Sequence, residues 1–185
     1  MGYTSKSIGI VQQYLREIKS VCDLGAQNNY SGAANPAPYI SEWYKEKGIT
    51  DYIAIDLNGE NDSKKWDLSE PVKTSKQYDL VADFGTSEHV KDLYGCMANV
   101  NKLCKIGGLM IHENPKVGNW PLHGFHYRDK DFYYQLAEAN GYQLELLEEH
   151  PAMGNTTDGW NVIAVMRKTK DGFIARHEFP KSYDK

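Results

Sequence analysis

The chain has 185 residues, of which 41% are hydrophobic and 25% are charged, and its formal net charge is −4. This composition is typical of a globular domain with a sizeable core. The negative charge argues against a large sequence-independent nucleic-acid surface, which needs an excess of Lys and Arg. No stretch is apolar over a length that could span a membrane, and the N-terminus lacks an apolar signal segment. We therefore expect a cytoplasmic protein without a membrane partner.

The hydrophobic pattern alternates between strand-like and helix-like segments. Strands are predicted at 20–24, 51–56, 78–84, 109–112 with its end at Pro115, 142–147 and 160–166, and 66–68 is a further short strand or its exit. Helices are predicted at 4–17, 38–47, 88–103 and 129–140. Strands that alternate with helices form a parallel sheet covered on both faces, whereas the last two strands have no helix between them. We predict a single α/β domain over 1–185, with its core at about 20–168 and a short polar C-terminal tail. Its Rossmann-like, doubly wound, mostly parallel sheet has seven strands and an antiparallel edge hairpin.

The three cysteines are odd in number and show no paired spacing, so reduced thiols are expected, with Cys22 in the core. Helix ends carry local signals. Thr4 or Ser5 is the predicted N-cap of the first helix, and Asp129 that of the last, which Gly141 closes.

The first predicted strand ends in an acid and a glycine, at Asp23 and Gly25. In an open α/β sheet, the carboxyl ends of the central strands form the binding crevice. Glycine lets the backbone approach a ligand without a Cβ in the way. The second strand also ends in an acid, Asp56, and a third acid, Asp67, follows shortly after. These positions are therefore the predicted floor of a ligand site.

The order of these features resembles the class I S-adenosylmethionine-dependent methyltransferases. Asp23-Leu24-Gly25 is similar to the start of the family's acid-x-Gly-x-Gly-x-Gly motif, although Gln27 and Asn29 replace the later glycines. The 78–81 segment (Tyr-Asp-Leu-Val), followed by Glu-His-Val at 88–90, is similar to the family's fourth strand and its exit. The 103–111 segment resembles the family's entry to strand five, with Ile106 in place of the usual proline.

The resemblance implies S-adenosyl-L-methionine as the cofactor. In the family, an acid at the end of strand two holds the ribose, which corresponds to Asp56, and residues after strand three lie near adenine. The implied cofactor-binding residues are Asp23, Gly25, Gln27, Asp56, Asp67, Leu68 and Asp83. A carboxylate can accept two ribose hydroxyl bonds at once, and such charge-assisted bonds are strong.

Three histidines are candidates for a catalytic base: His112 ends strand five, and His123 and His126 follow in the loop over the same edge. The spacing of the three matches no strong metal motif, so no metal is predicted. Aromatic residues in the same loop suit an apolar or aromatic acceptor. We expect the acceptor between the N-terminal helix, this loop and the connection at 151–159.

The resulting hypothesis is methyl transfer to oxygen or nitrogen of a small-molecule acceptor. A protein partner or a homo-oligomer that completes the site is a further alternative. The alternative is a catalytically inactive methyltransferase-fold module for binding or interaction, which the altered glycine motif favours. A nicotinamide-dependent oxidoreductase is disfavoured because Gly-x-Gly-x-x-Gly is absent. A nucleic-acid methyltransferase is disfavoured because the sequence has no basic stripe and no Asn-Pro-Pro-Tyr type motif.

Overall fold

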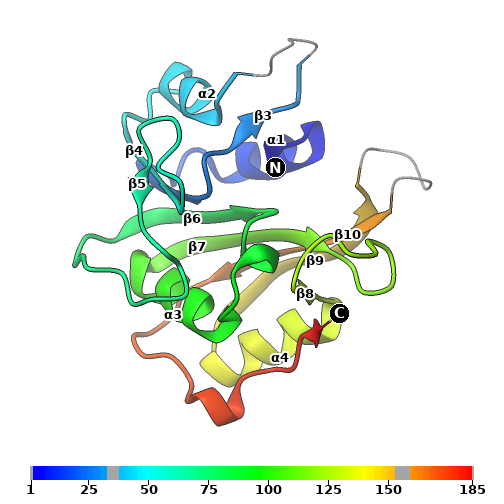
Figure 1. Cartoon of the computed structure of the whole chain (residues 1–185). Coiled ribbons are helices and arrows are strands. Elements are labelled where there is room, and N and C mark those ends of the chain that lie inside the picture. Colours follow the sequence, from blue (N-terminus) through cyan, green and yellow to red (C-terminus); the bar gives the residue numbers. More distant parts are fainter. Residues whose placement is uncertain (1, 33–37, 153–158, 185) are drawn as a thin grey trace.

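A seven-stranded sheet forms the centre of the computed structural model, which describes residues 2–32, 38–152 and 159–184 (Figure 1). The strand order is β5-β4-β2-β6-β7-β10-β9. The strands are β2 (Ser20–Leu24), β4 (Asp51–Asp56), β5 (Lys64–Lys65), β6 (Tyr78–Phe84), β7 (Cys104–Pro115), β9 (Gln143–Pro151) and β10 (Trp160–Arg167). The first five in this order are parallel, and β10 runs antiparallel to both β7 and β9. The predicted mostly parallel sheet with an antiparallel edge hairpin is confirmed.

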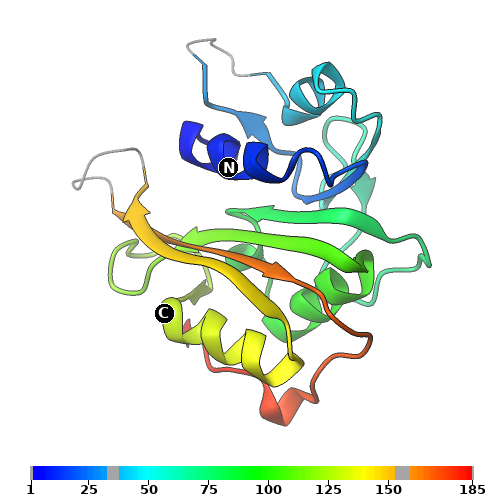
Figure 2. The same ribbon diagram turned by 180° about the vertical axis from the view of Figure 1, so that it is seen from behind.

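Helices cover both faces of the sheet. The helices α1 (Ser5–Tyr14) and α2 (Ile40–Glu46) lie on one side, and α3 (Leu93–Leu103) and α4 (Lys130–Asn140) lie on the other (Figures 1 and 2). Because successive side chains of a strand point to opposite faces, the central strands contribute to two hydrophobic clusters. Val21 packs in the cluster with α1 and α2, and the next residue, Cys22, packs in the cluster with α3 and α4.

Two small sheets join the terminal segments to loops. In the first, β1 (Gly2–Tyr3) pairs with β3 (Asn28–Asn29) in the loop that follows β2. In the second, β8 (His126–Tyr127) pairs with β11 (Tyr183–Asp184) near the end of the chain. Two 3-10 turns complete the structure, η1 (Ser87–His89) and η2 (Arg176–Glu178). None of the helices within the described ranges is both long and apolar enough to cross a membrane.

The predicted helix caps are confirmed at both α1 and α4. The Thr4 side chain accepts a hydrogen bond from the Ser7 N–H at 3.2 Å, and the Ser7 hydroxyl accepts one from the Thr4 N–H at 3.1 Å. Asp129 accepts from the Phe132 N–H at 2.9 Å. The α4 helix ends at Gly141, whose φ of 69° lies in the left-handed region that glycine adopts without strain.

Several predicted boundaries are wrong; α1 ends at Tyr14 instead of residue 17, and β9 ends at Pro151 instead of residue 147. The helix predicted over 88–103 begins only at Leu93, and η1 precedes it. The Asp83 carboxylate explains this, because it accepts hydrogen bonds from the N–H groups of Thr86 (3.2 Å) and Ser87 (3.0 Å) and so wraps a tight turn. The segment 66–68, predicted as a short strand or its exit, follows the strand at 64–65 and is therefore the exit. The strand β7 begins at Cys104, well before the predicted 109, and ends at Pro115 as predicted.

All three cysteines are free and buried, and Cys22 lies in the core as predicted. Burial raises the pKa of each thiol, in the case of Cys104 to about 12. A thiol is reactive as the thiolate, so these cysteines are chemically quiet in the folded protein.

The strand order places a topological switch point beside β2. The chain continues from β2 to β4 and β5 on one side, and then returns to β6 on the other side. Ligands of open α/β sheets bind outside the carboxyl ends of the strands at such a point.

Candidate functional site

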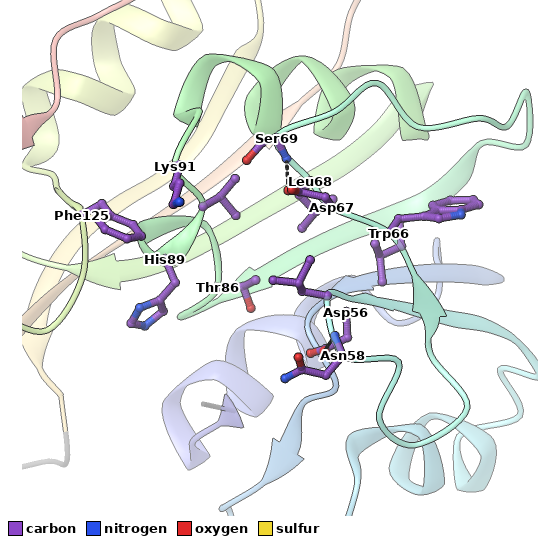
Figure 3. A pocket seen from close by; sticks show the side chains of 13 residues that line it. Asp56, Asn58, Trp66, Asp67, Leu68, Ser69, Thr86, His89, Lys91 and Phe125 are labelled. Carbon is purple, nitrogen blue, oxygen red and sulfur yellow. Dashed lines mark hydrogen bonds between the residues drawn. The ribbon is translucent and has the colours of Figure 1, made fainter.

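A cavity of about 440 Å³ lies at the carboxyl end of β4, between that strand, the segment after β5 and the turn after β6 (Figure 3). Its walls include Asp56, Asp67, Leu68, Thr86 and His89. Three of the predicted cofactor-binding residues, Asp56, Asp67 and Leu68, are thus brought together at one cavity. Asp23, Gly25, Gln27 and Asp83 are not among its lining residues.

Asp56 is held rigidly at the cavity wall. Its Oδ2 accepts a hydrogen bond from the Ala26 N–H at 3.1 Å, and its Oδ1 accepts one from the Asn58 N–H at 2.8 Å. An ionised carboxylate has about four acceptor sites, so each oxygen can accept a further hydrogen bond from a ligand. Asp56 therefore combines a fixed orientation with remaining acceptor capacity.

Asp67 and Leu68 form the opposite part of the wall, as Figure 3 shows. Asp67 Oδ1 accepts from the Ser69 N–H at 2.8 Å, which fixes a turn. The Leu68 carbonyl accepts from Asn99 Nδ2 at 2.9 Å, and the Leu68 side chain packs in the core. The wall thus pairs an acid with an apolar surface, which suits a flat heterocycle that carries polar edges.

The turn after β2 departs from an open glycine loop. Gly25 has a φ of 83°, and a Cβ at this position would lie 2.6 Å from Thr86 Oγ1. The Gln27 side chain is buried here, and its Nε2 donates to the Leu24 carbonyl at 2.6 Å and to Thr86 Oγ1 at 2.7 Å. Gln27 therefore fills space between the carboxyl ends of β2 and β6. Glycines in place of this side chain would leave that space open.

Asp23 lies away from the cavity, in the hydrophobic interior. The hydroxyls of Tyr3 and Tyr52 donate to its two carboxylate oxygens at 2.5 Å and 2.8 Å. Burial raises the pKa of Asp23 to about 7, although the two hydrogen bonds oppose this shift. In this arrangement Asp23 binds together β1, β2 and β4 beneath the turn that carries Gly25.

Asp83 and His112 form a buried pair behind the site. His112 Nδ1 lies 2.9 Å from Asp83 Oδ2, and the Ser87 hydroxyl donates to the same carboxylate. Burial raises the pKa of the Asp83 carboxyl, but the hydrogen bond and charge of His112 outweigh burial and lower the pKa below its usual range. Neither residue lines the first cavity or the second one described next. Both fix the turn that follows β6.

A second cavity, of about 270 Å³, lies beside the first, with Phe84, Gly85, Glu88, Glu113, Trp120 and His123 among its lining residues. His123 is thus placed at a cavity, as predicted for a residue that contacts an acceptor. His126 lines neither cavity; its ring nitrogens lie 3.1 Å from Ser182 Oγ and 3.2 Å from the Lys91 carbonyl oxygen.

The lining of the second cavity also includes Glu113, near the carboxyl end of β7. Glu113 accepts hydrogen bonds from the Ser7 hydroxyl (2.7 Å) and Asn161 Nδ2 (3.0 Å), and His150 Nε2 lies 3.3 Å away. Burial lowers the pKa of His150, but Glu113 more than compensates and raises it. Ala152, from the connection expected at the acceptor site, lines this cavity, whereas 153–158 lie outside the described residues.

Comparisons with known proteins find similarity in the fold alone. No protein-family model matches the sequence, and no curated protein matches it. Among solved structures, a 1,6-didemethyltoxoflavin-N1-methyltransferase from Burkholderia thailandensis, with bound 1,6-didemethyltoxoflavin and S-adenosylhomocysteine, superposes with a TM-score of 0.62 at 16% identity, over 88% of this chain and 76% of that chain.

Two further structures show the same similarity. The N-methyltransferase NodS of Bradyrhizobium japonicum gives a TM-score of 0.56 at 14% identity, over 88% of this chain and 94% of that one. A TehB-like S-adenosylmethionine-dependent methyltransferase of Corynebacterium glutamicum gives 0.58 at 18% identity, over 90% and 88%. The chain therefore has the fold of the class I S-adenosylmethionine-dependent methyltransferases, as the sequence resemblance predicted.

Proposed function

We propose that this protein binds S-adenosyl-L-methionine and transfers its methyl group to an oxygen or nitrogen atom of a small acceptor. The observation that carries the proposal is the cavity at the carboxyl end of β4, where Asp56 keeps acceptor capacity in a methyltransferase fold. One structural neighbour holds a small molecule together with S-adenosylhomocysteine, which supports a small acceptor.

In this proposal, Asp56 accepts hydrogen bonds from the ribose hydroxyls, and Asp67 and Leu68 lie beside the adenine. The acceptor occupies the second cavity, because that cavity lies next to the first and its walls are mainly apolar. The reaction is an in-line displacement at the methyl carbon. A bond forms from the acceptor atom to the methyl group as the bond to sulfur breaks, and the electron pair stays on sulfur.

The protein mainly needs to align the two reactants and exclude water. A general base is needed only if the acceptor atom carries a proton that must leave. His123 is the candidate for this role, since it alone of the three predicted histidines lines the acceptor cavity. His112 and His126 are assigned to positioning of the surrounding loops, together with Asp23 and Asp83.

A second candidate function has its own supporting observation. Gln27 and Thr86 fill the crevice above Gly25, and Gln27 Oε1 is buried without a hydrogen-bond partner in the described chain. A side chain in this position favours a methyltransferase-fold module that binds no cofactor. The same orphan oxygen also fits a ligand that donates a hydrogen bond to it, such as the ammonium group of the cofactor.

Calorimetric titration of the full chain with S-adenosylmethionine and S-adenosylhomocysteine, and with NAD as a control, separates these functions. Micromolar binding of the first two ligands and none of NAD is expected. Asp56→Ala should weaken binding by about 1.5–3 kcal/mol, the range for hydrogen bonds to a charged group. The matched control is Glu60→Ala, an exposed acid outside the cavity. No binding of either ligand by the wild-type chain would favour the inactive module.

A further inference from the structure

Three potential metal ligands meet between the two cavities, although their spacing along the chain matches no metal-binding motif. They are Glu88 and His89 in η1 and His123 in the loop after β7, and their ligand atoms all lie within 4.8 Å of one another. Glu88 Oε1 is 3.7 Å from His89 Nε2 and 3.6 Å from His123 Nε2. Of the three histidines predicted as candidates for a catalytic base, only His123 belongs to this set.

The environment of the Glu88 carboxylate points to a bound ion independently of the closeness of the three ligands. Glu88 is fully buried, and its Oε1 accepts no hydrogen bond from any residue that the structure describes. A buried carboxylate oxygen without a partner is costly, and native structures rarely leave one unexplained. This oxygen faces the two imidazoles at distances too long for hydrogen bonds, so an ion between the three groups would satisfy it.

Surrounding groups hold the carboxylate in place. Glu88 Oε2 accepts a hydrogen bond from Asn114 Nδ2 at 3.0 Å, and the Tyr133 hydroxyl donates to Asn114 Oδ1. Such outer hydrogen bonds orient the ligands of metal sites and are part of their design. Because Asn114 binds Oε2, the other oxygen, Oε1, is left to face the histidines and to bind an ion.

The loop that carries His123 is fixed to the same residue. The Phe125 N–H donates to the Glu88 carbonyl at 2.7 Å, and a Cβ on Gly124 would lie 2.8 Å from that carbonyl oxygen. Glycine at this position therefore permits the close approach that brings His123 to Glu88. The three ligands therefore come from two segments, η1 and the loop after β7, and a main-chain hydrogen bond joins these segments.

We propose that Glu88, His89 and His123 form a binding site for a divalent transition-metal ion of the zinc class. In a tetrahedral zinc site with bonds of about 2.0–2.1 Å, the ligand atoms lie roughly 3.4 Å apart, close to the two distances here. Two imidazoles and one carboxylate are a known zinc ligand set that leaves a fourth position open. Glu88 and His123 line the second cavity and His89 the first, so the open position lies at their junction.

The metal site also restricts which methyl acceptors fit, an inference that rests on the proposed function. An acceptor with an oxygen or nitrogen lone pair could occupy the open position while its reactive atom faces the methyl group. Metal coordination lowers the pKa of a bound hydroxyl, so with the ion bound His123 acts as a ligand and no longer as the general base proposed above. The structure thus favours acceptors that carry a hydroxyl or another ligating group over purely apolar ones.

The test is titration of the metal-free full chain with Co²⁺ and Zn²⁺, followed by calorimetry and by the visible absorption of bound Co²⁺. One equivalent of ion should bind to the wild type. His123→Ala and Glu88→Gln should each lower the affinity at least 100-fold and remove the Co²⁺ bands. His177→Ala, which removes an exposed histidine outside the cluster, is the matched control and should bind as the wild type does.

Absence of stoichiometric binding, or equal loss of affinity in all three variants, would overturn the proposal. His123 is part-exposed in a loop, so its alanine variant is expected to fold, and far-ultraviolet circular dichroism checks this. Titration of the same samples with S-adenosylhomocysteine separates the two proposals. Metal binding without cofactor binding rejects only the methyltransferase function, and the reverse result rejects only the ion site.

Discussion

Asp23→Asn should remove a large part of the pH dependence of stability. Burial raises the pKa of Asp23 in the folded protein from its ordinary value of 3.8 to about 7. Between these two pH values, the folded state holds a proton on this carboxyl that the unfolded state has released. The free energy of unfolding therefore falls as the pH rises from about 4 to about 7, and levels off above that. An asparagine stays neutral throughout and lacks this contribution.

The size of the effect follows from the two pKa values. Each unit of difference corresponds to about 1.4 kcal/mol, so the full contribution is roughly 4 kcal/mol. Much of it falls between pH 5 and pH 8, where linkage gives a loss of about 2–3 kcal/mol in the wild type that the variant does not show. Asp23 is fully buried, so solvent does not screen this contribution.

Urea unfolding of both proteins at pH 5, 6, 7 and 8, followed by tryptophan fluorescence, measures this difference. Other groups titrate in the same window, but they are common to both proteins and cancel in the comparison. Equal slopes of unfolding free energy against pH would refute the reasoning, because they would mean that Asp23 keeps its ordinary pKa in the folded protein. A steeper fall in the variant would reverse the sign and refute it as well.

Three further predictions concern the site. Gln27→Gly should leave the affinity for S-adenosylhomocysteine unchanged or raise it by up to about tenfold, that is 1.4 kcal/mol, in calorimetry; a sharp loss would make Gln27 itself a ligand. Gly124→Ala should lower the free energy of unfolding by about 1–3 kcal/mol, because its Cβ would lie 2.8 Å from a main-chain oxygen. The control is Gly9→Ala on α1, which has open space and should raise it by about 0.5–1 kcal/mol. Glu113→Gln should lower the pKa of His150 in an NMR titration, since Glu113 outweighs burial there; an unchanged pKa would contradict this.

Most of the fold could be predicted because it depends on local signals and on the rhythm of apolar segments. Asp129 and Gly141 bound α4 as their cap chemistry requires, and the missing helix before β10 gave the antiparallel hairpin. The start of α3 could not be predicted, because the competing turn depends on the side chain of Asp83, several residues earlier. The periodicity of apolar residues does not reveal such a local side-chain-to-backbone hydrogen bond.

The site was predicted less completely than the fold. The strand-end acid Asp56 reaches the cavity, whereas Asp23 has the same local pattern and binds two tyrosines instead. Whether a strand-end acid faces a cavity or is buried against tyrosines depends on the side chains that approach from neighbouring strands, here β1 and β4. Likewise, Glu88 and His123 are 35 positions apart, and only the folded loop brings them together. The Glu-His pair directly after β6 was the only local signal for this cluster.

The burial of the cysteines makes them a natural reporter of motion in the sheet. Cys22 on β2 and Cys96 on α3 share one cluster with Cys104 at the start of β7, and each thiol is buried with a raised pKa. A thiol-labelling reagent can react only when the layer of α3 and α4 separates from the sheet. The rate of labelling would therefore report how often α3 and α4 separate from the sheet in the wild-type protein. A ligand whose binding suppresses this separation would slow the labelling.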